Sequence, residues 1–332
     1  MENRQKRIPL FLVILLDIIL AALMVLVIFA STFSIKKPKQ SEPNITAVLK
    51  KIEAGIKAEE REIEQYQKEI DMLSPWQKEF KDKFSEQLIS TENSYKSPNI
   101  SIDIETLESN GTVYHLADIY IANIDNFKTY TANGEFKYFS TQNAVDMAND
   151  ANAILAISGD FYSYQSAGLL VRNSYVYMDD EAYCDICVMY KDGSIETLMR
   201  GEYDKEELLA KEPLQIWNFG PALLDSEGKA KDYYNMSRAV SYKNPRSALG
   251  YYEPGHYCFL VADGRQEGYS VGFDMYELAR VFEDLGCTCA YNLDGGGSAV
   301  MLFNGEKFSR QSNSGDRELG DILIICESEE TK

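Results

Sequence analysis

The chain has 332 residues, of which 45% are hydrophobic, and it carries a formal net charge of −19. This hydrophobic content suffices for a packed core, so the composition excludes a chain that is disordered throughout. The negative charge argues against nucleic acid as a partner, because nucleic-acid-binding proteins contact phosphates through basic patches. An anionic ligand would need a local cationic pocket. The length favours one large domain with an appendage.

Residues 8–33, which begin at Ile8 and end at Phe33, form an almost continuous hydrophobic segment, IPLFLVILLDIILAALMVLVIFASTF. It exceeds the roughly 20 residues that span a bilayer and lacks an obvious signal-peptide cleavage site. Cations on both sides make the positive-inside rule a weak guide, with Arg4 among those before it. We predict a cytoplasmic N-terminus and transmembrane helix in residues 1–35. The protein would then be a single-pass cell-membrane protein with an extracytoplasmic C-terminal domain.

A charged segment with a regular hydrophobic pattern follows. From Ile45 to Leu73, apolar residues recur at alternating steps of four and three, with Glu59 as the polar exception. This heptad pattern predicts a coiled coil, whereas a single helix lying on the domain or the membrane is the alternative. We assign residues 36–98 to a helical stalk and linker, through which the chain would form a homo-oligomer. Residues 99–332 would form the globular domain.

The globular part alternates strand-like and helix-like segments. YCFLVAD, residues 257–263, predicts a buried strand, and CTCAYNLD, residues 287–294, predicts a second one. Between them, DMYELARVFEDLG predicts a helix with Asp274 at its N-cap and Gly286 just past its end. A strand–helix–strand unit predicts parallel strands. The fold class is therefore α/β (mixed α+β), with a largely parallel or mixed sheet and flanking helices.

Aspartates follow three predicted strands. Asp263 and Asp294 end the two strands of this unit, and Asp160 follows a strand predicted over residues 153–158. In open α/β sheets, ligands bind outside the carboxyl ends of the strands. We therefore expect the three carboxylates to share one site, and we assign them as candidate catalytic residues.

A triple glycine followed by a serine comes directly after Asp294. Gly295, Gly296 and Gly297 let the backbone turn tightly and approach a ligand closely. Successive amides in such a turn form an anion site, to which Ser298 adds a hydroxyl. The alternative is a tight turn that merely requires positive φ.

Three arginines accompany these acids, in NPRSALGYY, ADGRQEGYS and SGDRELGD. They are Arg246, Arg265 and Arg317, and the planar fork of arginine suits phosphate or carboxylate. The six cysteines and two histidines match no zinc-site spacing. For Cys184 and Cys187, the sequence leaves a disulfide and free thiols open.

Several of these motifs together resemble the phosphodiester glycosidase family. They are RSALG, LVADGRQEGYS, ELARVFEDLGCTCAYNLDGGGSAVM and GDRELGDI, preceded by AISGDFYSYQSAGLLVRN and NFGPALLDSEGK. The resemblance extends over about residues 146–325. This family includes an enzyme that removes N-acetylglucosamine from mannose-6-phosphate diesters. The segments outside it resemble those of anchored bacterial members described as exopolysaccharide-related.

The resemblance implies a catalytic domain that hydrolyses the glycosidic bond of a sugar-1-phosphodiester in extracytoplasmic glycan or exopolysaccharide metabolism. The residues that it places in the pocket are Asp160, Arg246, Asp263, Arg265, Asn292, Asp294, Gly295, Gly296, Gly297, Ser298 and Arg317. Two positions depart from the family pattern, since Ser158 stands where Asn is usual and Gly320 replaces a commoner Ser.

We expect a sugar phosphate or glycan as the partner. One of Asp160, Asp263 and Asp294 would act on water or on the anomeric carbon, and we favour Asp294. Arg246, Arg265 or both would bind phosphate together with the glycine turn. No cofactor is predicted. A divalent cation held by the aspartates would instead make the protein a metal-dependent phosphodiesterase. The other alternative is a non-catalytic, membrane-anchored carbohydrate-binding protein, for which 22 tyrosines would supply stacking faces.

Overall fold

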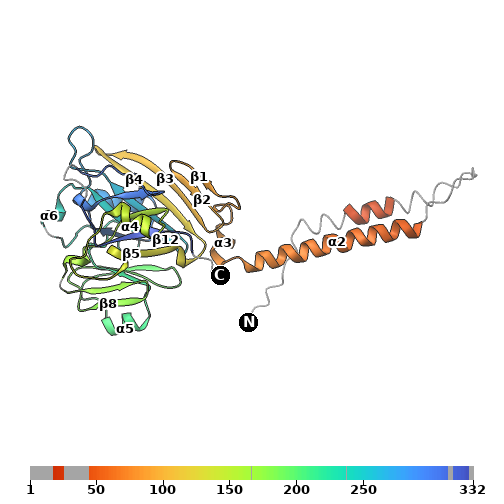
Figure 1. Cartoon of the computed structure of the whole chain (residues 1–332), viewed down its shortest axis with the longest axis horizontal. Helices are drawn as coiled ribbons and strands as arrows, with labels where there is room; N and C mark the ends of the chain where they lie inside the picture. Colours follow the sequence, from red (N-terminus) through yellow and green to blue (C-terminus); the bar gives the residue numbers. More distant parts are fainter. Residues whose placement is uncertain (1–17, 26–44, 166, 237, 313–316, 329–332) are drawn as a thin grey trace, which may run out of the picture. The chain divides into compact units, whose positions relative to one another are not determined.

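The computed structural model describes residues 18–25, 45–165, 167–236, 238–312 and 317–328. The chain divides into two compact units, Met1–Lys68 and Glu69–Lys332. The predicted helix after the hydrophobic segment is present as α2 (Ile45–Met72), which has 28 residues (Figure 1). Leu49 and Ile52 of its heptad pattern are exposed. The single chain therefore does not show the predicted coiled coil or the homo-oligomer.

The predicted location in a cell membrane is wrong. Within the described ranges, no helix is long and apolar enough to cross a membrane. Residues 8–17 and 26–33 of the predicted span lie outside those ranges, and the helical part that is described covers residues 18–25. The finding overturns the single-pass arrangement with an extracytoplasmic C-terminal domain.

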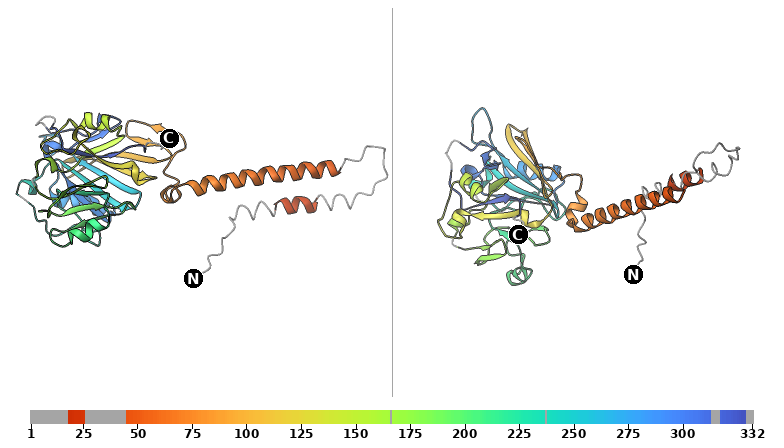
Figure 2. Two further views of the ribbon diagram at one scale, coloured as in Figure 1. Left: turned by 60° about the horizontal axis from the view of Figure 1, so that its bottom comes forward. Right: turned by 45° about the vertical axis from the view of Figure 1, so that its right-hand side comes forward.

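The described part of the second unit contains three sheets (Figures 1 and 2). The first sheet has the order β1 (Ile89–Ser90), β2 (Ser94–Lys96), β3 (Ile100–Ser109), β4 (Thr112–Ile121), β13 (His256–Ala262), β12 (Arg246–Glu253), β14 (Cys289–Leu293). The second sheet has the order β16 (Glu306–Lys307), β15 (Met301–Phe303), β6 (Leu155–Ser158), β17 (Asp321–Ile325), β5 (Phe127–Thr131). The third sheet has the order β10 (Ile195–Leu198), β9 (Ile186–Met189), β11 (Gln215–Trp217), β7 (Leu169–Arg172), β8 (Tyr175–Asp179).

Short helices and turns connect these strands. They are α3 (Pro75–Glu79), η1 (Ile124–Asn126), η2 (Ala132–Gly134), α4 (Ala144–Asp150), η3 (Tyr162–Tyr164), α5 (Lys205–Ala210), α6 (Arg238–Ser241), α7 (Met275–Asp284) and η4 (Gly296–Ser298). The mixed α+β class is confirmed. The expected parallel sheet is wrong, because neighbouring strands in all three sheets pair antiparallel.

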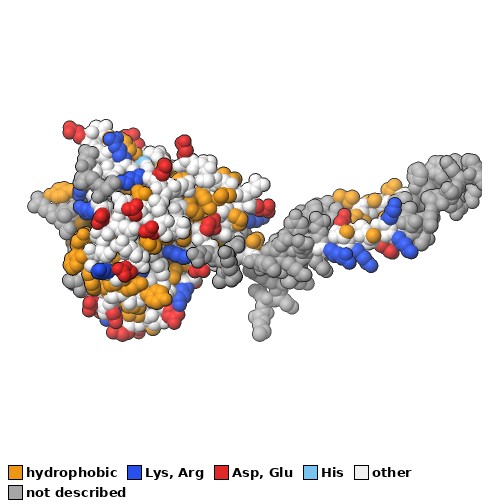
Figure 3. Space-filling model, viewed as in Figure 1, with side chains coloured by type: hydrophobic (Ala, Val, Ile, Leu, Met, Phe, Trp, Pro, Cys, Tyr) orange, Lys and Arg blue, Asp and Glu red, His pale blue; other side chains and the backbone are white. Residues whose placement is uncertain are grey.

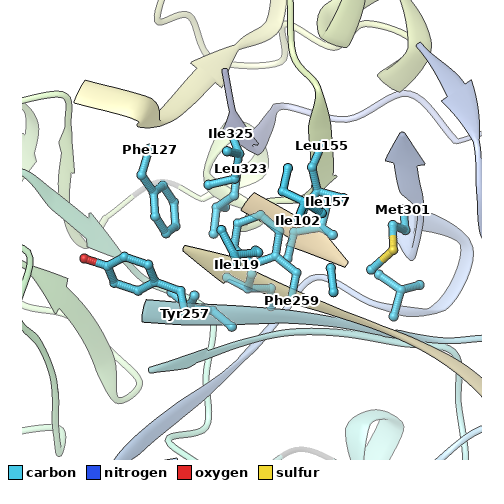
Figure 4. Close-up of a cluster of buried hydrophobic side chains, with 14 of the residues drawn as sticks. Ile102, Ile119, Phe127, Leu155, Ile157, Tyr257, Phe259, Met301, Leu323 and Ile325 are labelled. Carbon is cyan, nitrogen blue, oxygen red and sulfur yellow. The ribbon is translucent and has the colours of Figure 1, made fainter. Parts of the chain in front are cut away.

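The main core lies between the first and second sheets. Ile119 and Phe259 of the first sheet and Ile157 and Leu323 of the second belong to one buried cluster (Figure 4). Alternate residues of a strand point to opposite faces. The intervening residues of β13, such as Leu260, therefore face away from this cluster and pack with α7. On the far side of the second sheet, α4 covers β17. The order of layers is helix, sheet, sheet, helix.

Helix α7 forms as its sequence predicts. Asp274 is the N-cap and makes a reciprocal capping box with Glu277, which satisfies amides at the start of the helix. Leu278 and Phe282, one helical turn apart, are buried against the first sheet. The strand before it and the strand after it run in the same direction, but they are not neighbours. Strand β12 lies between β13 and β14 and pairs antiparallel with both.

This arrangement creates the edge at which the site forms. Because β13 and β14 both run antiparallel to β12, their carboxyl ends meet the amino end of β12. The register places Arg246 opposite Ala262, and Ser247 opposite Leu293. The residues that follow β13 and β14 therefore lie at one edge together with Arg246, although the strands are not adjacent parallel partners.

Candidate active site

Two adjoining hollows lie at this edge. The arginine hollow, of about 180 Å³, is lined by Arg246, Arg265, Arg317, Asn244, Asp294 and the glycines 295–297, among others. The acid hollow is lined by Asp160, Asp294, Asp321, Ser158, Ser298 and Arg317, among others. The acid hollow is small, with a volume of about 10 Å³. Asp294 and Arg317 line both hollows, so the two hollows adjoin at these side chains.

Asp294 is half-buried where the two hollows meet. Its backbone is fixed at the ends of β6 and β14, because Asp294 N donates to Gly159 O at 2.9 Å and Ser158 Oγ donates to Asp294 O at 2.9 Å. Loss of hydration raises the pKa of Asp294 to about 6, and the charge of Asp160 adds to this effect. The Ser298 hydroxyl and the Arg317 charge oppose the rise. Asp294 can therefore exchange a proton near neutral pH.

Asp160 is buried at the floor of the acid hollow, and its carboxylate is held rigidly. Oδ1 accepts a hydrogen bond from the amide of Tyr162 at 3.0 Å. Oδ2 accepts one from the amide of Asn218 at 2.9 Å and lies 2.7 Å from Nη2 of Arg172. Donors on three sides fix the position of this carboxylate.

Arg172 and Asp321 complete a buried ionic network that the sequence analysis did not predict. Arg172 ends β7 in the third sheet, and its Nε donates to Oδ2 of Asp321 on β17 of the second sheet at 2.8 Å. Burial raises the pKa of Asp321, and the charge of Arg172 opposes this rise. The sequence contains two hints of this network. Arg172 is the charged last residue of an otherwise apolar strand, and Asp321 is the second aspartate of GDRELGDI. The network joins two sheets directly beneath Asp160.

Arg265 extends into the arginine hollow from the turn after β13. Its Nε and Nη2 donate to Asn244 Oδ1 at 3.0 and 2.7 Å, which orients an otherwise exposed guanidinium. Arg246 is more deeply placed, with 4% of its surface exposed. Its described hydrogen bonds use Nε and Nη2 and go to carbonyl groups, including Phe273 O at 2.9 Å. Arg265 thus faces the hollow, whereas Arg246 forms its wall.

Glycine is required in this turn because a larger residue would clash with Pro245 or crowd Arg265. A Cβ on Gly295 would lie 2.6 Å from Pro245 O, closer than a real contact allows. Gly296 has φ of 62°, and a Cβ there would lie 3.2 Å from Arg265 Nη2. The Gly296 amide donates to Pro245 O, and the Ser298 amide donates to Gly295 O. These two amides are therefore engaged within the turn itself.

Ser298 and Arg317 close the junction between the hollows. Ser298 is fully buried in η4, whereas Arg317 is exposed and its Nη1 lies 3.4 Å from Ser298 Oγ. Ser158 stands at the position where the family resemblance leads us to expect Asn. Besides its contact with Asp294 O, its Oγ lies 2.7 Å from Oγ of Ser247. Ser158 thus ties β6 of the second sheet to β12 of the first.

Asp263 does not face either hollow. Its Oδ2 accepts a hydrogen bond from Tyr269 at 2.8 Å and lies 3.2 Å from Nε2 of His115 on β4. Its Oδ1 accepts one from the Arg310 amide at 3.0 Å. Asn292 is likewise buried behind the site, where Nδ2 donates to Gly220 O at 2.7 Å. The structure therefore brings together Asp160, Asp294 and the three arginines, and it places Asp263 and Asn292 in supporting positions.

The alternative of a metal-dependent phosphodiesterase would require side chains that are placed to hold a metal ion. In the part of the chain that the structure describes, no group of three or more His, Cys, Asp or Glu side chains is placed to hold a metal ion. All six cysteines are free thiols, including Cys184 and Cys187.

The chain is similar to known proteins in sequence and in fold. The sequence model of the phosphodiester glycosidase family matches residues 151–326. The SPbeta prophage-derived uncharacterized protein YomE of Bacillus subtilis (strain 168) is 27% identical over 197 residues, which are 57% of this chain and 30% of that protein. The chain thus spans less than a third of the length of this relative.

Two solved structures have the same fold. One is the catalytic domain of zebrafish N-acetylglucosamine-1-phosphodiester alpha-N-acetylglucosaminidase, auto-inhibited by its pro-peptide. It has a TM-score of 0.55 and 19% identity, over 73% of this chain and 87% of that one. The other is a hypothetical protein from Synechocystis, with a TM-score of 0.54 and 13% identity, over 69% of this chain and 62% of that one. Because the family match covers more than half of the sequence and includes Asp160, Asp294 and all three arginines, the chain belongs to the phosphodiester glycosidase family.

Proposed function

We propose that the protein hydrolyses the glycosidic bond of a sugar-1-phosphodiester in glycan or exopolysaccharide metabolism. Membership of the family indicates a glycosidase that acts on phosphodiesters. One observation carries the finer proposal: Asp294 lines both the acid hollow and the arginine hollow. A carboxylate at that junction can reach an anomeric carbon whose phosphate lies among the arginines. The zebrafish protein is named for action on a bond of this kind.

The arginine hollow supports binding of the phosphate. With a net charge of −19, the chain as a whole repels an anion, so binding requires local cations. Arg265 and Arg317 supply them, and arginine pairs with phosphate through two parallel hydrogen bonds. The leaving group is a phosphate monoester whose second pKa is about 6, so it departs with little protonation. Stabilising its developing charge is the main task of the arginines.

The acid hollow supports reaction at the anomeric carbon. Cleavage of a glycoside passes through a transition state with positive charge on the sugar ring, which a fixed carboxylate stabilises. Asp160, held by Arg172 and two amides, has this role in our proposal. Asp294 acts on water or directly on the anomeric carbon, because its raised pKa suits proton transfer near neutral pH.

The proposal is tested by the position of bond cleavage. The purified protein is incubated in ¹⁸O-water with the α-1-(methyl phosphate) diesters of glucose, galactose and N-acetylglucosamine. We expect ¹⁸O on the anomeric carbon of the released sugar and none in methyl phosphate. Incorporation into phosphate would show P–O cleavage and contradict the proposal, as would failure to release any of the three sugars.

Replacing Arg265 with alanine is expected to lower kcat/KM by about 10- to 100-fold, the order of magnitude of a lost hydrogen bond to a charged group. Arg265→Lys should recover only part of the loss, because lysine keeps the charge but not the fork. Steady-state kinetics with the turned-over diester measure both effects. The matched control is Arg280→Ala, which removes an exposed arginine of α7. A loss no larger than that of the control would refute the phosphate contact.

The pH dependence of kcat/KM should show that the charge of Arg317 lowers the pKa of Asp294. If Asp294 must be ionised, kcat/KM of the wild-type protein falls as the pH decreases through about 6. Arg317 lowers the pKa of Asp294, so Arg317→Ala should move this acidic limb to higher pH. The measurement is kcat/KM between pH 4 and pH 9 for both proteins. An acidic limb that stays in place or moves to lower pH would contradict the assignment.

A further inference from the structure

Three aromatic side chains stand at the edge of the acid hollow, and we call Phe139, Phe161 and Tyr164 the aromatic rim. Phe161 and Tyr164 line the hollow, and their rings stack with centroids 4.8 Å apart. The ring of Phe139 lies edge-on to Tyr164 at 5.9 Å. The exposed fractions of the three are 76% for Phe139, 36% for Phe161 and 51% for Tyr164. Aromatic surface of this extent is thus open to solvent beside the proposed catalytic carboxylates.

The backbone of Phe139 is strained, and a hydrogen bond fixes its loop. Its φ is 57°, a left-handed conformation that is a genuine outlier for a bulky side chain. The amide of Phe139 donates to Ser163 O at 2.8 Å, which ties its loop to the segment that carries Phe161 and Tyr164. Strained residues of this kind concentrate at functional sites. The fold therefore holds an exposed ring beside the hollow, at a position where glycine or asparagine would be less strained.

Other aromatic side chains occur close to Phe139 in the chain. Tyr138 precedes Phe139 in the chain, and its ring contacts Phe136 at 5.5 Å. Phe136 in turn stacks on Tyr177 of β8 at 4.6 Å. In Figure 3, hydrophobic side chains gather over the region of β5 and β8. Aromatic side chains are therefore found outside the three-residue rim as well.

The chemistry of the rim indicates what covers it. Its rings are uncharged, whereas the cations that a phosphate needs lie in the arginine hollow, which meets the acid hollow at Asp294. A sugar ring presents an apolar face of C–H groups that stacks on aromatic side chains, and tyrosine adds a hydroxyl. With the phosphate among the arginines and the anomeric carbon at Asp294, the sugar side of the substrate extends toward Phe161 and Tyr164.

From this arrangement we propose that the aromatic rim binds further sugar units of an oligosaccharide or polysaccharide. The preferred substrate is then a 1-phosphodiester of a glycan chain, not of a single sugar. The inference rests on the proposed function, because it uses the position of the cleaved bond to orient the chain. The inference assigns Phe139 as a specificity-determining residue. Phe139 belongs to the rim but lines neither hollow.

The test compares matched substrates, the α-1-(methyl phosphate) diesters of maltotriose and glucose and those of chitotriose and N-acetylglucosamine. For a pair that is hydrolysed, the wild-type kcat/KM should favour the trisaccharide by about 10-fold or more, which corresponds to ~1.4 kcal/mol. Phe139→Ala should remove most of this preference and leave the single-sugar rate unchanged, whereas Phe139→Trp should retain it. The control is Tyr233→Ala, which removes an exposed tyrosine that lines none of the hollows of the site.

Equal kcat/KM for trisaccharide and single sugar would overturn the inference and leave the proposed function intact. A preference that survives Phe139→Ala would overturn it as well. If neither pair is hydrolysed, the rim is judged by binding alone, and the proposed function is judged separately by the three single-sugar diesters described above. In that case saturation-transfer NMR with maltotriose and chitotriose should show contacts with the wild-type protein that Phe139→Ala weakens. Contacts that are absent, or unchanged in the variant, would overturn the inference.

Discussion

Replacing Asp294 with asparagine is expected to remove most of the hydrolytic activity and, at neutral pH, to make the protein more stable. The activity should fall by about 10²- to 10⁴-fold, the usual contribution of a positioned acid or base. The gain in stability follows from the raised pKa. Asparagine has nearly the shape of aspartate but removes the cost of an ionised carboxylate in a half-buried position.

The sign of the stability effect changes with pH in a defined way. The pKa of Asp294 is about 6 in the folded protein and ordinarily 3.8, so folding disfavours the ionised form. The folded state therefore loses stability as the pH rises from about 4 through about 6, and this loss is absent in Asp294→Asn. Above pH 6 the variant should be more stable by up to about 3 kcal/mol, and below pH 4 the difference should vanish.

Urea unfolding and turnover at pH 4 and pH 8 measure both effects on the same protein samples. Asp232→Asn, at an exposed position, is the matched control and should change neither stability nor activity appreciably. Full activity in Asp294→Asn would eliminate the catalytic role. A variant that is less stable than wild type at pH 8 would show instead that Asp294 is a structural residue.

Local sequence rules predicted those parts of the fold that depend on neighbouring residues. The capping pair Asp274 and Glu277 marks the start of α7, and the apolar spacing of Leu278 and Phe282 marks its buried face. Both features act within one or two turns of helix, so they can be seen in the sequence. The same holds for β13, whose predicted bounds differ from the observed ones by one residue at each end.

The direction of neighbouring strands could not be predicted in this way. The sequence shows that a strand, a helix and a strand follow one another, but not that β12 lies between the two strands. Insertion of β12 makes every pairing antiparallel and still leaves the ends of β13 and β14 at one edge. Asp294 and Arg246 therefore line one hollow, as the family resemblance implied. The parallel sheet from which we expected Asp263 and Asp294 at one edge is wrong.

The orientation of side chains at this edge also required the structure. Asp263 follows its strand as Asp294 does, yet its carboxylate turns toward His115 and Tyr269, because β4 is the other neighbour of β13. Conversely, Arg172 and Asp321 lie 149 positions apart in the sequence and meet only because the second and third sheets come together at Asp160. Contacts between distant segments carry the information that local patterns lack.

Replacing Arg172 with methionine is the substitution that should destabilise the protein most. Arg172 is fully buried between Asp160 and Asp321, at 2.7 and 2.8 Å, so its removal leaves two carboxylates without their cation. Breaking a buried pair in this way costs about 3–5 kcal/mol, which corresponds to a fall in Tm of roughly 10 °C for a unit of this size. Thermal unfolding measures the change.

The catalytic consequence of this network is tested by a second variant. Arg172→Met combined with Asp321→Asn removes one of the two unpaired charges, so it should recover part of the lost stability and deviate from additivity. It should still hydrolyse more slowly than wild type, because Asp160 remains without the guanidinium that fixes it. Lys191→Met, which breaks an exposed pair with Glu212, is the control and should change little. Additive losses in the double variant would show that Arg172 and Asp321 act independently, and the network would then not be the element that positions Asp160.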